Sequence, residues 1–275
     1  MTERAELPTY VLGHSQRELK RLIRQAELFE PATEQLFRMA GLRSGMSVLD
    51  VGSGAGDVSF IAARLVGPSG KVVGIDNSAD AIALADARAQ ERGLWNVRFV
   101  QADLNEWTSD RTFDAVVGRH ILLHQPDAAA SLRQVTRYVR PGGLVIFQEF
   151  NFPDELISIP PVPLYHTGYS WVHEAISKVG WDRHIGLRLY PIFIEAGLPA
   201  PKLIAYSNVE AGPDSTVYEY LADVVHTFLP LIERFGVATA DEIQVDTIAE
   251  RLRSEALARQ AILTLPPVVG AWTRK

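Results

Sequence analysis

Short apolar runs alternate with amphipathic stretches through the middle of the chain. The amphipathic patterns span residues 58–65, 79–92 and 127–139, and turn residues follow the last two of them, at Gly93 and at 141–143. The apolar runs read SVLDVG (47–52), KVVGID (71–76), NVRFVQAD (96–103), FDAVVGRH (113–120) and GLVIFQEF (143–150). This alternation predicts an α/β protein with a doubly wound parallel sheet, covered by helices on both faces.

Two further helices are predicted before this sheet. Ser15 followed by Glu18 forms a capping box at the start of the first helix. Pro31 opens the second helix, because proline is favoured in a first turn, and Gly41 closes it. We expect residues 1–41 to form a helical lid.

The pattern changes after the fifth apolar run. Residues 151–200 are rich in proline and aromatic side chains, and we expect them to form a helical cap over one edge of the sheet. Residues 201–275 are expected to supply the remaining strands with a helical insertion. The strands are predicted within PKLIAYSNVE (201–210) and AILTLPPVVGAWTRK (261–275), and the insertion is predicted at 215–259.

The composition narrows the classes of function. With 27 basic and 33 acidic residues the formal charge is −6, and no basic cluster stands out, which argues against a nucleic-acid partner. The chain has no cysteine, so a disulfide framework, a thiolate metal site and a cysteine nucleophile are excluded. No segment has the apolar length of a membrane span or the pattern of a signal peptide, and we expect a cytoplasmic protein.

Three glycines stand at alternate positions where the first predicted strand gives way to a helix. Gly52, Gly54 and Gly56 allow a ligand to approach a backbone without side chains at the carboxyl end of the sheet. A tight turn without a ligand is the alternative, but a turn does not require three glycines. We therefore expect the core at residues 42–150 to bind a ligand at this loop.

The surroundings of the loop disfavour a dinucleotide. The fingerprint G-x-G-x-x-G needs a small residue at position 57 or 59, where this chain has Asp57 and Ser59. Asp50 and Asp57 bracket the loop, so a pyrophosphate would meet charges of its own sign. A ligand that carries ammonium and sulfonium groups fits better, although Asp57 is also placed to cap the following helix.

Acidic residues close three successive predicted strands. Asp50 lies at the buried end of the first strand and needs a partner there. Asp76 ends the second strand and can accept both hydroxyls of a ribose, and Asp103 can accept a hydrogen bond from an adenine amino group. Capping of the next helix is the alternative for Asp76, but Asn77 and Ser78 already offer capping oxygens.

In combination these motifs resemble the class I S-adenosylmethionine-dependent methyltransferases. VLDVGSGAGDVSF is similar to their D-x-G-x-G-x-G loop, VVGIDNS to the segment with the ribose-binding acid, and VQADL to the segment with the adenine-binding acid. LRQVTRYVRPGGLVIFQEF is similar to their helix and fifth strand. The resemblance covers residues 42–150 and points to the small-molecule branch that includes the ubiquinone and menaquinone biosynthesis methyltransferases.

The resemblance implies a Rossmann-like seven-stranded sheet whose last strand is antiparallel, with S-adenosylmethionine bound over the first strands. The cofactor-binding residues that it implies are Asp50, Gly52, Gly54, Gly56, Asp76, Asn77, Asp103, Leu104 and Arg119. The glycines would flank the methionine moiety, Asp76 would hold the ribose, and Asp103 with Leu104 would hold the adenine. The product would be S-adenosylhomocysteine.

The fourth predicted strand ends in VVGRHILLH, where the family places residues beside the sulfonium. We expect Arg119 and His120 to line the active site, with His120 as a candidate catalytic residue. Arg119 is expected to be the partner of the cofactor carboxylate or, alternatively, to form a surface salt bridge. Glu149 ends the fifth strand and is a candidate for contacting the acceptor, or else a solvated carboxylate. His120 and His124 are spaced like metal ligands on a helical face, but no acid completes a set and we predict no metal.

Candidates for acceptor binding come from the predicted cap. Aromatic and histidine side chains suit a pocket for a flat or apolar molecule, although they equally suit the core of a helical subdomain. These residues are Tyr165, His166, Tyr169, Trp171, His173 and Trp181. His166 and His173 are candidate catalytic bases, and Tyr10 and His14 are candidates for closing over the cofactor.

The favoured hypothesis is a methyltransferase that moves a methyl group by in-line displacement to an oxygen, nitrogen or carbon atom of a small organic acceptor. The alternative from another class is a non-catalytic regulatory protein that binds S-adenosylmethionine or S-adenosylhomocysteine. A filled pocket beside the methyl carbon would favour that alternative. The failed fingerprint disfavours an oxidoreductase, and the acidic balance and aromatic cap disfavour a macromolecular methyltransferase. As partners we expect the acceptor alone, without nucleic acid or membrane, in a monomer or a homodimer.

Overall fold

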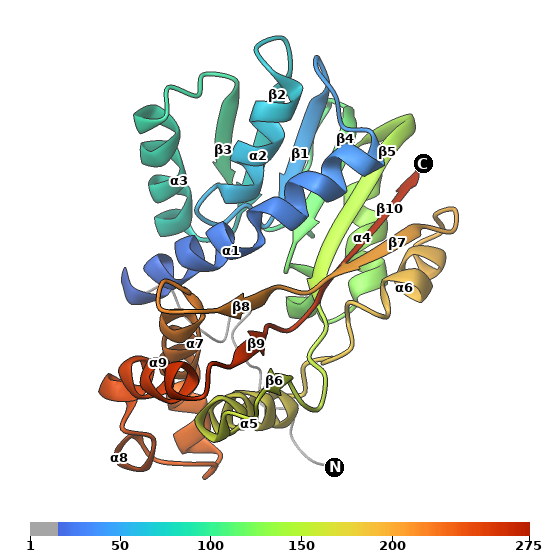
Figure 1. Ribbon diagram of the computed structural model, residues 1–275. Helices are drawn as coiled ribbons and strands as arrows, with labels where there is room; N and C mark the ends of the chain where they lie inside the picture. The colour runs from blue at the N-terminus through green and yellow to red at the C-terminus, as the bar shows by residue number, and fades with distance from the viewer. Residues whose placement is uncertain (1–15) are drawn as a thin grey trace.

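A seven-stranded sheet forms the centre of the structure, in the order β3-β2-β1-β4-β5-β10-β7 (Figure 1). The computed structural model describes residues 16–275, apart from the side chains of residues 16–20 and of Leu22. Several N-terminal side chains named above lie outside the described residues: those of Tyr10, His14, Ser15 and Glu18. The predicted Rossmann-like α/β fold is confirmed by this sheet and its helices.

The parallel strands correspond to the apolar runs of the sequence. They are β1 (Ser47–Val51), β2 (Lys71–Asp76), β3 (Val97–Gln101), β4 (Phe113–Arg119) and β5 (Val139–Phe150). Asp50 of β1 pairs with Gly74 on one side and with Val117 on the other. Since the strand order turns back between β1 and β4, the carboxyl ends of these strands border one crevice, which is where open α/β sheets bind ligands.

The last strand of the chain, β10 (Val268–Arg274), runs antiparallel between β5 and β7 (Lys202–Tyr206). This confirms the expected antiparallel last strand. The segment predicted as one strand at 201–210 contains two, because β8 (Val209–Ala211) leaves the main sheet. β8 and β6 (Ser158–Ile159) both pair with β9 (Ile262–Thr264) in a small second sheet.

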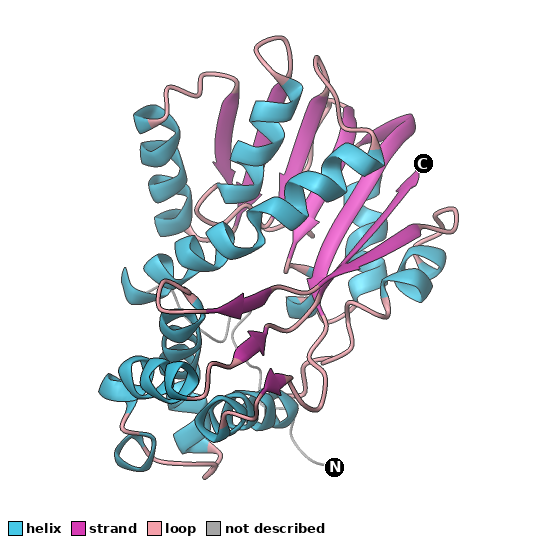
Figure 2. Ribbon diagram, viewed as in Figure 1, coloured by secondary structure: helices cyan, strands magenta, loops and turns pink. Residues whose placement is uncertain are grey.

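Helices cover both faces of the main sheet (Figure 2). They are α1 (Gln16–Ala40), α2 (Asp57–Val66), α3 (Ala79–Glu91), α4 (Ala128–Thr136) and α6 (Leu189–Glu195). The apolar side chains of α1 and α2 pack on one face, and those of α4 and α6 pack on the other. α6 lies within the segment expected to form the cap, so the structure places part of that segment in the sheet layers instead.

The cap is made by helices from two separate segments of the chain. α5 (Pro163–Val179), α7 (Val217–Arg234) and α9 (Ile248–Ala258) share one apolar core, which also takes in Phe29 of α1. The short α8 (Ala240–Ile243) lies between α7 and α9 in the chain. In Figure 1 this group lies below the sheet, with the second sheet beside it. The helical insertion thus packs together with α5 as one unit.

A single helix, α1, replaces the two helices predicted before the sheet. Pro31 lies inside α1 instead of opening a second helix. A proline removes one hydrogen bond of a helix, but Phe29 and Thr33 on either side of it are fully buried, and this packing holds the helix together. Leu36 and Phe37 then pack on the sheet, while the part of α1 before Pro31 extends toward the cap.

The start of β5 also differs from the prediction. A turn was expected at 141–143, but β5 begins at Val139, and its pairing with β4 shifts register between Phe113 and Ala115. Gly142 has a φ of 74°, and its N–H donates to the carbonyl of Lys275 at 2.7 Å. The glycines therefore form an irregular first part of a strand, which the C-terminal residue stabilises.

Gly270 of β10 marks a close approach between α1 and the sheet. A Cβ at this position would lie 2.7 Å from the Cδ1 of Leu36, which is fully buried. We predict that Gly270→Ala lowers the free energy of unfolding by about 1–3 kcal/mol, because the core has no room for the methyl group. Urea unfolding measures this change. The double variant with Leu36→Ala should lose less than the sum of the two single variants, and additive losses would show that the two side chains do not meet.

Candidate functional site

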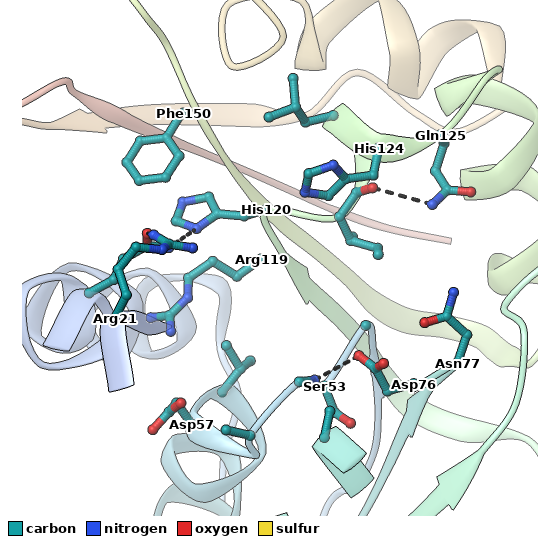
Figure 3. Close-up of a pocket in the computed structure, with 18 of the residues that line it drawn as sticks. Arg21, Ser53, Asp57, Asp76, Asn77, Arg119, His120, His124, Gln125 and Phe150 are labelled. Atoms are coloured by element: carbon teal, nitrogen blue, oxygen red, sulfur yellow. Dashed lines mark hydrogen bonds between the residues drawn. The ribbon is translucent and has the colours of Figure 1, made fainter. Parts of the chain in front are cut away.

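A pocket opens at the carboxyl ends of β1, β2 and β4, between the main sheet and the cap (Figure 3). Its lining comes from the glycine loop, from the ends of these strands, from α1, and from the cap helices α5 and α7. The predicted site residues that line it are Gly52, Gly54, Asp76, Asn77, Asp103, Leu104, Arg119 and His120. These eight residues come from four segments of the sequence, which the fold brings together at one pocket.

The glycine loop presents bare backbone to this pocket. Gly54 has a φ of 51°, and nothing lies within 4 Å of the position that its Cβ would occupy. Gly52 and Gly56 also have positive φ, but a Cβ there would lie 2.6 Å from Ile121 or from Phe60. Gly54 thus leaves room for a ligand, whereas Gly52 and Gly56 allow the loop to pack closely on its neighbours.

Asp76 is held at the end of β2 by two backbone donors. The N–H of Gly54 donates to Oδ2 at 2.9 Å, and the N–H of Ser78 donates to Oδ1 at 2.9 Å. Each carboxylate oxygen keeps a further site for a donor. The N-cap of α3 is Ser78, whose hydroxyl accepts from the N–H of Ala81, so the capping interpretation of Asp76 is wrong.

Asp103 and Leu104 line the pocket beyond the end of β3. Oδ1 of Asp103 accepts from the N–H of Asn105 at 2.8 Å, and its carbonyl accepts from the N–H of Trp107 at 2.8 Å. These bonds fix the loop and leave the second carboxylate oxygen for another donor.

Asp50 lies beneath the loop and is absent from the pocket lining. The residue is fully buried, and its Oδ2 accepts from the hydroxyl of Ser59 at 2.6 Å. Burial raises the pKa of Asp50 to about 7, against the opposing effect of the Ser59 hydrogen bond. Ser59 is therefore the partner that a buried acid requires, and Asp50 supports the loop from below.

Asp57 lines the pocket as one member of an ion pair. Nη2 of Arg88 in α3 donates to its Oδ1 at 2.7 Å, and Nη1 of Arg88 donates to the carbonyl of Ala55 at 2.6 Å. The N-cap of α2 is Gly56, which has no side chain, and Asp57 is the first residue of the helix, so the capping interpretation of Asp57 is wrong. Arg88 ties the glycine loop to α3, a role that no local sequence pattern indicates.

Arg119 ends β4 beside the pocket. Its Nη1 donates to the hydroxyl of Thr33 at 3.0 Å, and this hydroxyl donates to Oε1 of Gln148 at 2.7 Å. Burial lowers the pKa of Arg119, while the charges of Asp57 and Asp50 oppose that shift. No carboxylate of residues 16–275 whose side chain is described forms an ion pair with Arg119, so the surface salt-bridge interpretation is wrong.

His120 follows with a φ of 56°, in the left-handed region that residues other than glycine rarely adopt. Its ring stacks on that of Phe150, with 3.9 Å between centroids and 10° between planes (Figure 3). Burial lowers the pKa of His120 well below its ordinary value, and the charge of Arg119 adds to this effect. The ring is therefore neutral at pH 7.

Glu149 is fully buried and is absent from the pocket lining. Its Oε1 accepts from the N–H of Ile121 at 3.0 Å and from the N–H of Leu122 at 2.8 Å, where the short helix η1 (Leu122–His124) begins. Burial raises the pKa of Glu149 to about 7, against these backbone hydrogen bonds. The solvated interpretation is wrong, and this position supports a role in holding the loop rather than contact with an acceptor.

The cap closes the other side of the pocket with apolar and aromatic side chains. Trp181 meets the ring of Phe228 at 6.0 Å and that of His124 at 4.9 Å between centroids. The apolar chamber formed here is lined by Leu123, Phe150, Phe152, Val172, Ile176, Trp181, Val224 and Phe228. The pocket thus has a polar part at the glycine loop and an apolar part at the cap.

The two histidines proposed as bases in the cap lie outside the lining. Nε2 of His166 lies 2.8 Å from the hydroxyl of Ser158, near the start of α5. His173 contacts Arg183 and Asp154. The cap candidates that belong to the apolar core are Tyr165, Tyr169 and Trp171. Trp181 is the cap candidate that the structure brings to the pocket, and we carry neither histidine forward as a base.

Some lining residues were not identified from the sequence. Arg21 and Gln25 reach the pocket because α1 continues through Pro31, and Tyr220 comes from α7, which carries no motif. Ser53 lies within the glycine motif, and its hydroxyl is buried without a hydrogen-bond partner among the described residues. The polar side chain of Ser53 within the glycine motif is the one sequence feature that indicates a place in the pocket.

His120 and His124 both line the pocket. Within residues 16–275, no three His, Asp or Glu side chains that the structure describes come together as metal ligands would. Each helix in this part of the chain is too short or too polar to span a bilayer.

We predict that Glu149→Gln changes how stability depends on pH. The pKa of Glu149 is about 7 in the folded protein against an ordinary 4.5, so ionisation destabilises the fold progressively from pH 4.5 upward and fully above pH 7. Glutamine keeps an oxygen for the N–H groups of Ile121 and Leu122 but does not ionise. Between pH 5 and pH 8 the wild type should lose about 2–3 kcal/mol more unfolding free energy than the variant, measured with urea. An identical pH dependence would contradict this role.

Comparisons with known proteins agree with this geometry. Residues 42–196 match the family model described as a methyltransferase domain. A ubiquinone/menaquinone biosynthesis C-methyltransferase from Cellvibrio japonicus is 37% identical over 122 residues, which cover 43% of this chain and 49% of that protein. A demethylmenaquinone methyltransferase from Lactococcus lactis is 35% identical over 117 residues, which cover 42% and 46%. The chain spans about half the length of the curated relatives it matches.

A solved structure shares the fold. The SAM-dependent methyltransferase from Aquifex aeolicus superposes with a TM-score of 0.53 at 21% identity, covering 74% of this chain and 95% of that one. The family match takes in more than half of this chain. The chain therefore belongs to the methyltransferase-domain family, and the resemblance to the class I S-adenosylmethionine-dependent methyltransferases is confirmed.

Proposed function

We propose that this chain binds S-adenosylmethionine at the glycine loop and transfers its methyl group to an oxygen, nitrogen or carbon atom of a small organic acceptor. The observation that carries the proposal is one continuous pocket with a polar part and an apolar part. The polar part suits a charged nucleoside, and the apolar chamber suits a molecule that is enclosed by the cap.

The polar part fits the nucleoside. Asp76 has two acceptor sites left after its bonds to Gly54 and Ser78, which matches the two hydroxyls of a ribose. Asp103 and Leu104 are suited to the adenine, because one offers an acceptor and the other an apolar wall. The open space at Gly54 leaves room for the chain that links the ribose to the amino acid.

The amino-acid end has matching partners as well. Arg119 is a guanidinium at the pocket with a hydroxyl as its described partner, and it suits the carboxylate of the methionine moiety. The buried hydroxyl of Ser53 offers a further hydrogen bond. Together with Asp57, these residues give both signs of charge that an amino acid presents.

S-Adenosylmethionine supplies a methyl group on a positively charged sulfur, which is a good leaving group. The protein therefore needs mainly to align the acceptor and to exclude water. The carboxylates among the described lining residues, Asp57, Asp76 and Asp103, all stand on the loop side of the pocket. The chamber side offers aromatic walls, so its residues orient the acceptor rather than remove a proton from it with a carboxylate.

The regulatory alternative is less favoured. The chamber continues from the glycine loop without a side chain filling it, which supports an enzyme over a scaffold. The curated relatives are named for quinone biosynthesis, but they match about half of this chain or less, so the acceptor is argued from the cap of this chain. A cytoplasmic location, and a monomer or homodimer that binds no nucleic acid, stay predictions.

Binding of S-adenosylhomocysteine tests the cofactor site. We predict that Asp76→Ala weakens this binding by about 2–3 kcal/mol, since a charge-assisted contact with two hydroxyls is lost. Isothermal titration calorimetry measures the affinity. Asp80→Ala is the matched control, because Asp80 is exposed in the first turn of α3 and does not line the pocket. Equal affinities of the two variants would contradict the ribose role, and a folded wild type that does not bind at millimolar concentration would contradict the site.

Two ligands that differ in the amino-acid carboxylate test whether Arg119 binds that group. S-Adenosylhomocysteine carries the amino-acid carboxylate, and 5′-methylthioadenosine lacks it. We predict that Arg119→Met weakens binding of the first by about 10–100-fold, as expected for loss of a charged hydrogen bond, and leaves the second unchanged. The same calorimetric titration serves for both ligands. An equal loss for both would show that Arg119 does not bind the carboxylate.

A further inference from the structure

A chain of buried polar groups runs from α1 to the end of β4. Arg21 and Gln25 stand one helical turn apart, and Nη1 of Arg21 donates to Oε1 of Gln25 at 2.5 Å. Nε2 of Gln25 lies 3.2 Å from Nδ1 of His120. Arg21 and Gln25 are 6% and 8% exposed, so neither exchanges these contacts freely for water. Figure 3 shows Arg21 beside the ring of His120.

The chemistry of Arg21, Gln25 and His120 fixes the direction of each hydrogen bond between them. A guanidinium has only donors, so the atom of Gln25 that meets Arg21 must be the amide oxygen. The amide NH₂ then faces His120, and Nδ1 must accept from it. A neutral imidazole carries one proton. With Nδ1 as the acceptor, that proton is on Nε2.

The surroundings keep the ring neutral. His120 is stacked on Phe150 and meets the edge of Phe29 at 6.1 Å between centroids, so a charged ring would be poorly solvated. The charged or titratable groups that act on it are Arg119, His124 and Arg21, none of which is an acid. Burial and these neighbours lower the pKa of His120 well below its ordinary value.

The Nε2–H group has no hydrogen-bond partner among the described residues, although the atom is buried. A buried N–H without an acceptor is rare in folded proteins and calls for one. His120, Phe150 and Gln25 all line the pocket, and the rings of Phe150 and Phe29 contact the ring of His120. The side chains of Phe150 and Phe29 have no acceptor, the carbonyl of Phe150 accepts from the N–H of Gly186, and the side-chain oxygen of Gln25 accepts from Arg21.

We propose that Arg21 and Gln25 hold His120 as its Nε2–H tautomer, so that His120 positions the methyl acceptor by donating a hydrogen bond to an oxygen atom of that molecule. In this role His120 donates a hydrogen bond to the acceptor molecule and does not remove a proton from it. The acceptor class is an apolar molecule that carries an oxygen with a lone pair, such as a carbonyl, an ether or a phenolate. The role toward the acceptor rests on the proposed function, whereas the tautomer does not.

Nitrogen NMR of protein labelled with ¹⁵N-histidine tests the tautomer in the ligand-free protein. We expect His120 at pH 7.5 to show a protonated Nε2 and an unprotonated Nδ1. A protonated Nδ1, in a neutral or a charged ring, overturns the proposal. The resonances are assigned by their loss in His120→Gln.

The variant Gln25→Glu tests whether Gln25 determines the tautomer of His120. A carboxylate accepts hydrogen bonds from both Arg21 and His120, so the imidazole proton should move to Nδ1 and Nε2 should be unprotonated. Gln35→Glu is the matched control, because Gln35 is an exposed residue of the same helix, and it should leave the tautomer unchanged. A tautomer that is the same in Gln25→Glu and Gln35→Glu overturns the role of Gln25.

A probe pair tests the donor role in the complex with S-adenosylhomocysteine. Acetophenone carries a carbonyl oxygen, and in α-methylstyrene a CH₂ group replaces that oxygen. Acetophenone should shift the Nε2 resonance of His120, and α-methylstyrene should not. No shift with acetophenone up to its solubility limit, or equal shifts with both, overturns the donor role. Failure of S-adenosylhomocysteine to bind would overturn the proposed function but would leave the tautomer measurement standing.

Discussion

The hydrogen bond from the N–H of Gly54 to the carboxylate of Asp76 is the interaction on which the site depends. It joins the loop after β1 to the end of β2, and it holds bare backbone beside an acid with acceptor sites to spare. Gly54 has a positive φ, which glycine adopts readily, and it places no side chain in the pocket. The remaining parts of the site are arranged around this junction.

Buried groups below and beside the junction keep it rigid. Asp50 and Glu149 are fully buried acids one residue before the ends of β1 and β5, and burial raises the pKa of each to about 7. Neither lines the pocket, and each holds the structure after a strand end: Asp50 bonds Ser59 of α2, and Glu149 bonds the backbone at η1. Arg88 does the same from α3 through Asp57 and the carbonyl of Ala55. Acids at strand ends therefore serve two purposes here, and burial separates them: Asp76 and Asp103 border the pocket, while Asp50 and Glu149 support it.

The sequence predicts the part of the site that local patterns encode. Gly54 and Asp76 belong to short motifs at strand ends, and the parallel sheet brings such ends together, so fold and loop could be anticipated. Gln25 and Arg88 act through contacts between distant segments, and no spacing along the chain reveals such contacts. The sequence predicts that Pro31 opens a helix, because a proline that opens a helix and one inside a buried helix have the same local sequence. Only the packing of Phe29 and Thr33 distinguishes the two cases. The sequence also leaves open whether Glu149 is solvated, since the local sequence at a strand end does not show whether the side chain is buried.

The cap encloses the pocket, because α5 and α7 come from segments on either side of β7 and both contribute side chains to the pocket lining. The central claim is that a nucleoside binds at this loop and directs its sulfur toward the apolar chamber. A crystal structure of the complex with S-adenosylhomocysteine tests it most directly. The account predicts both ribose hydroxyls within hydrogen-bond distance of Asp76 and the sulfur facing the chamber between His120 and Trp181. A nucleoside bound away from Asp76, or a diphosphate in the glycine loop, would contradict it.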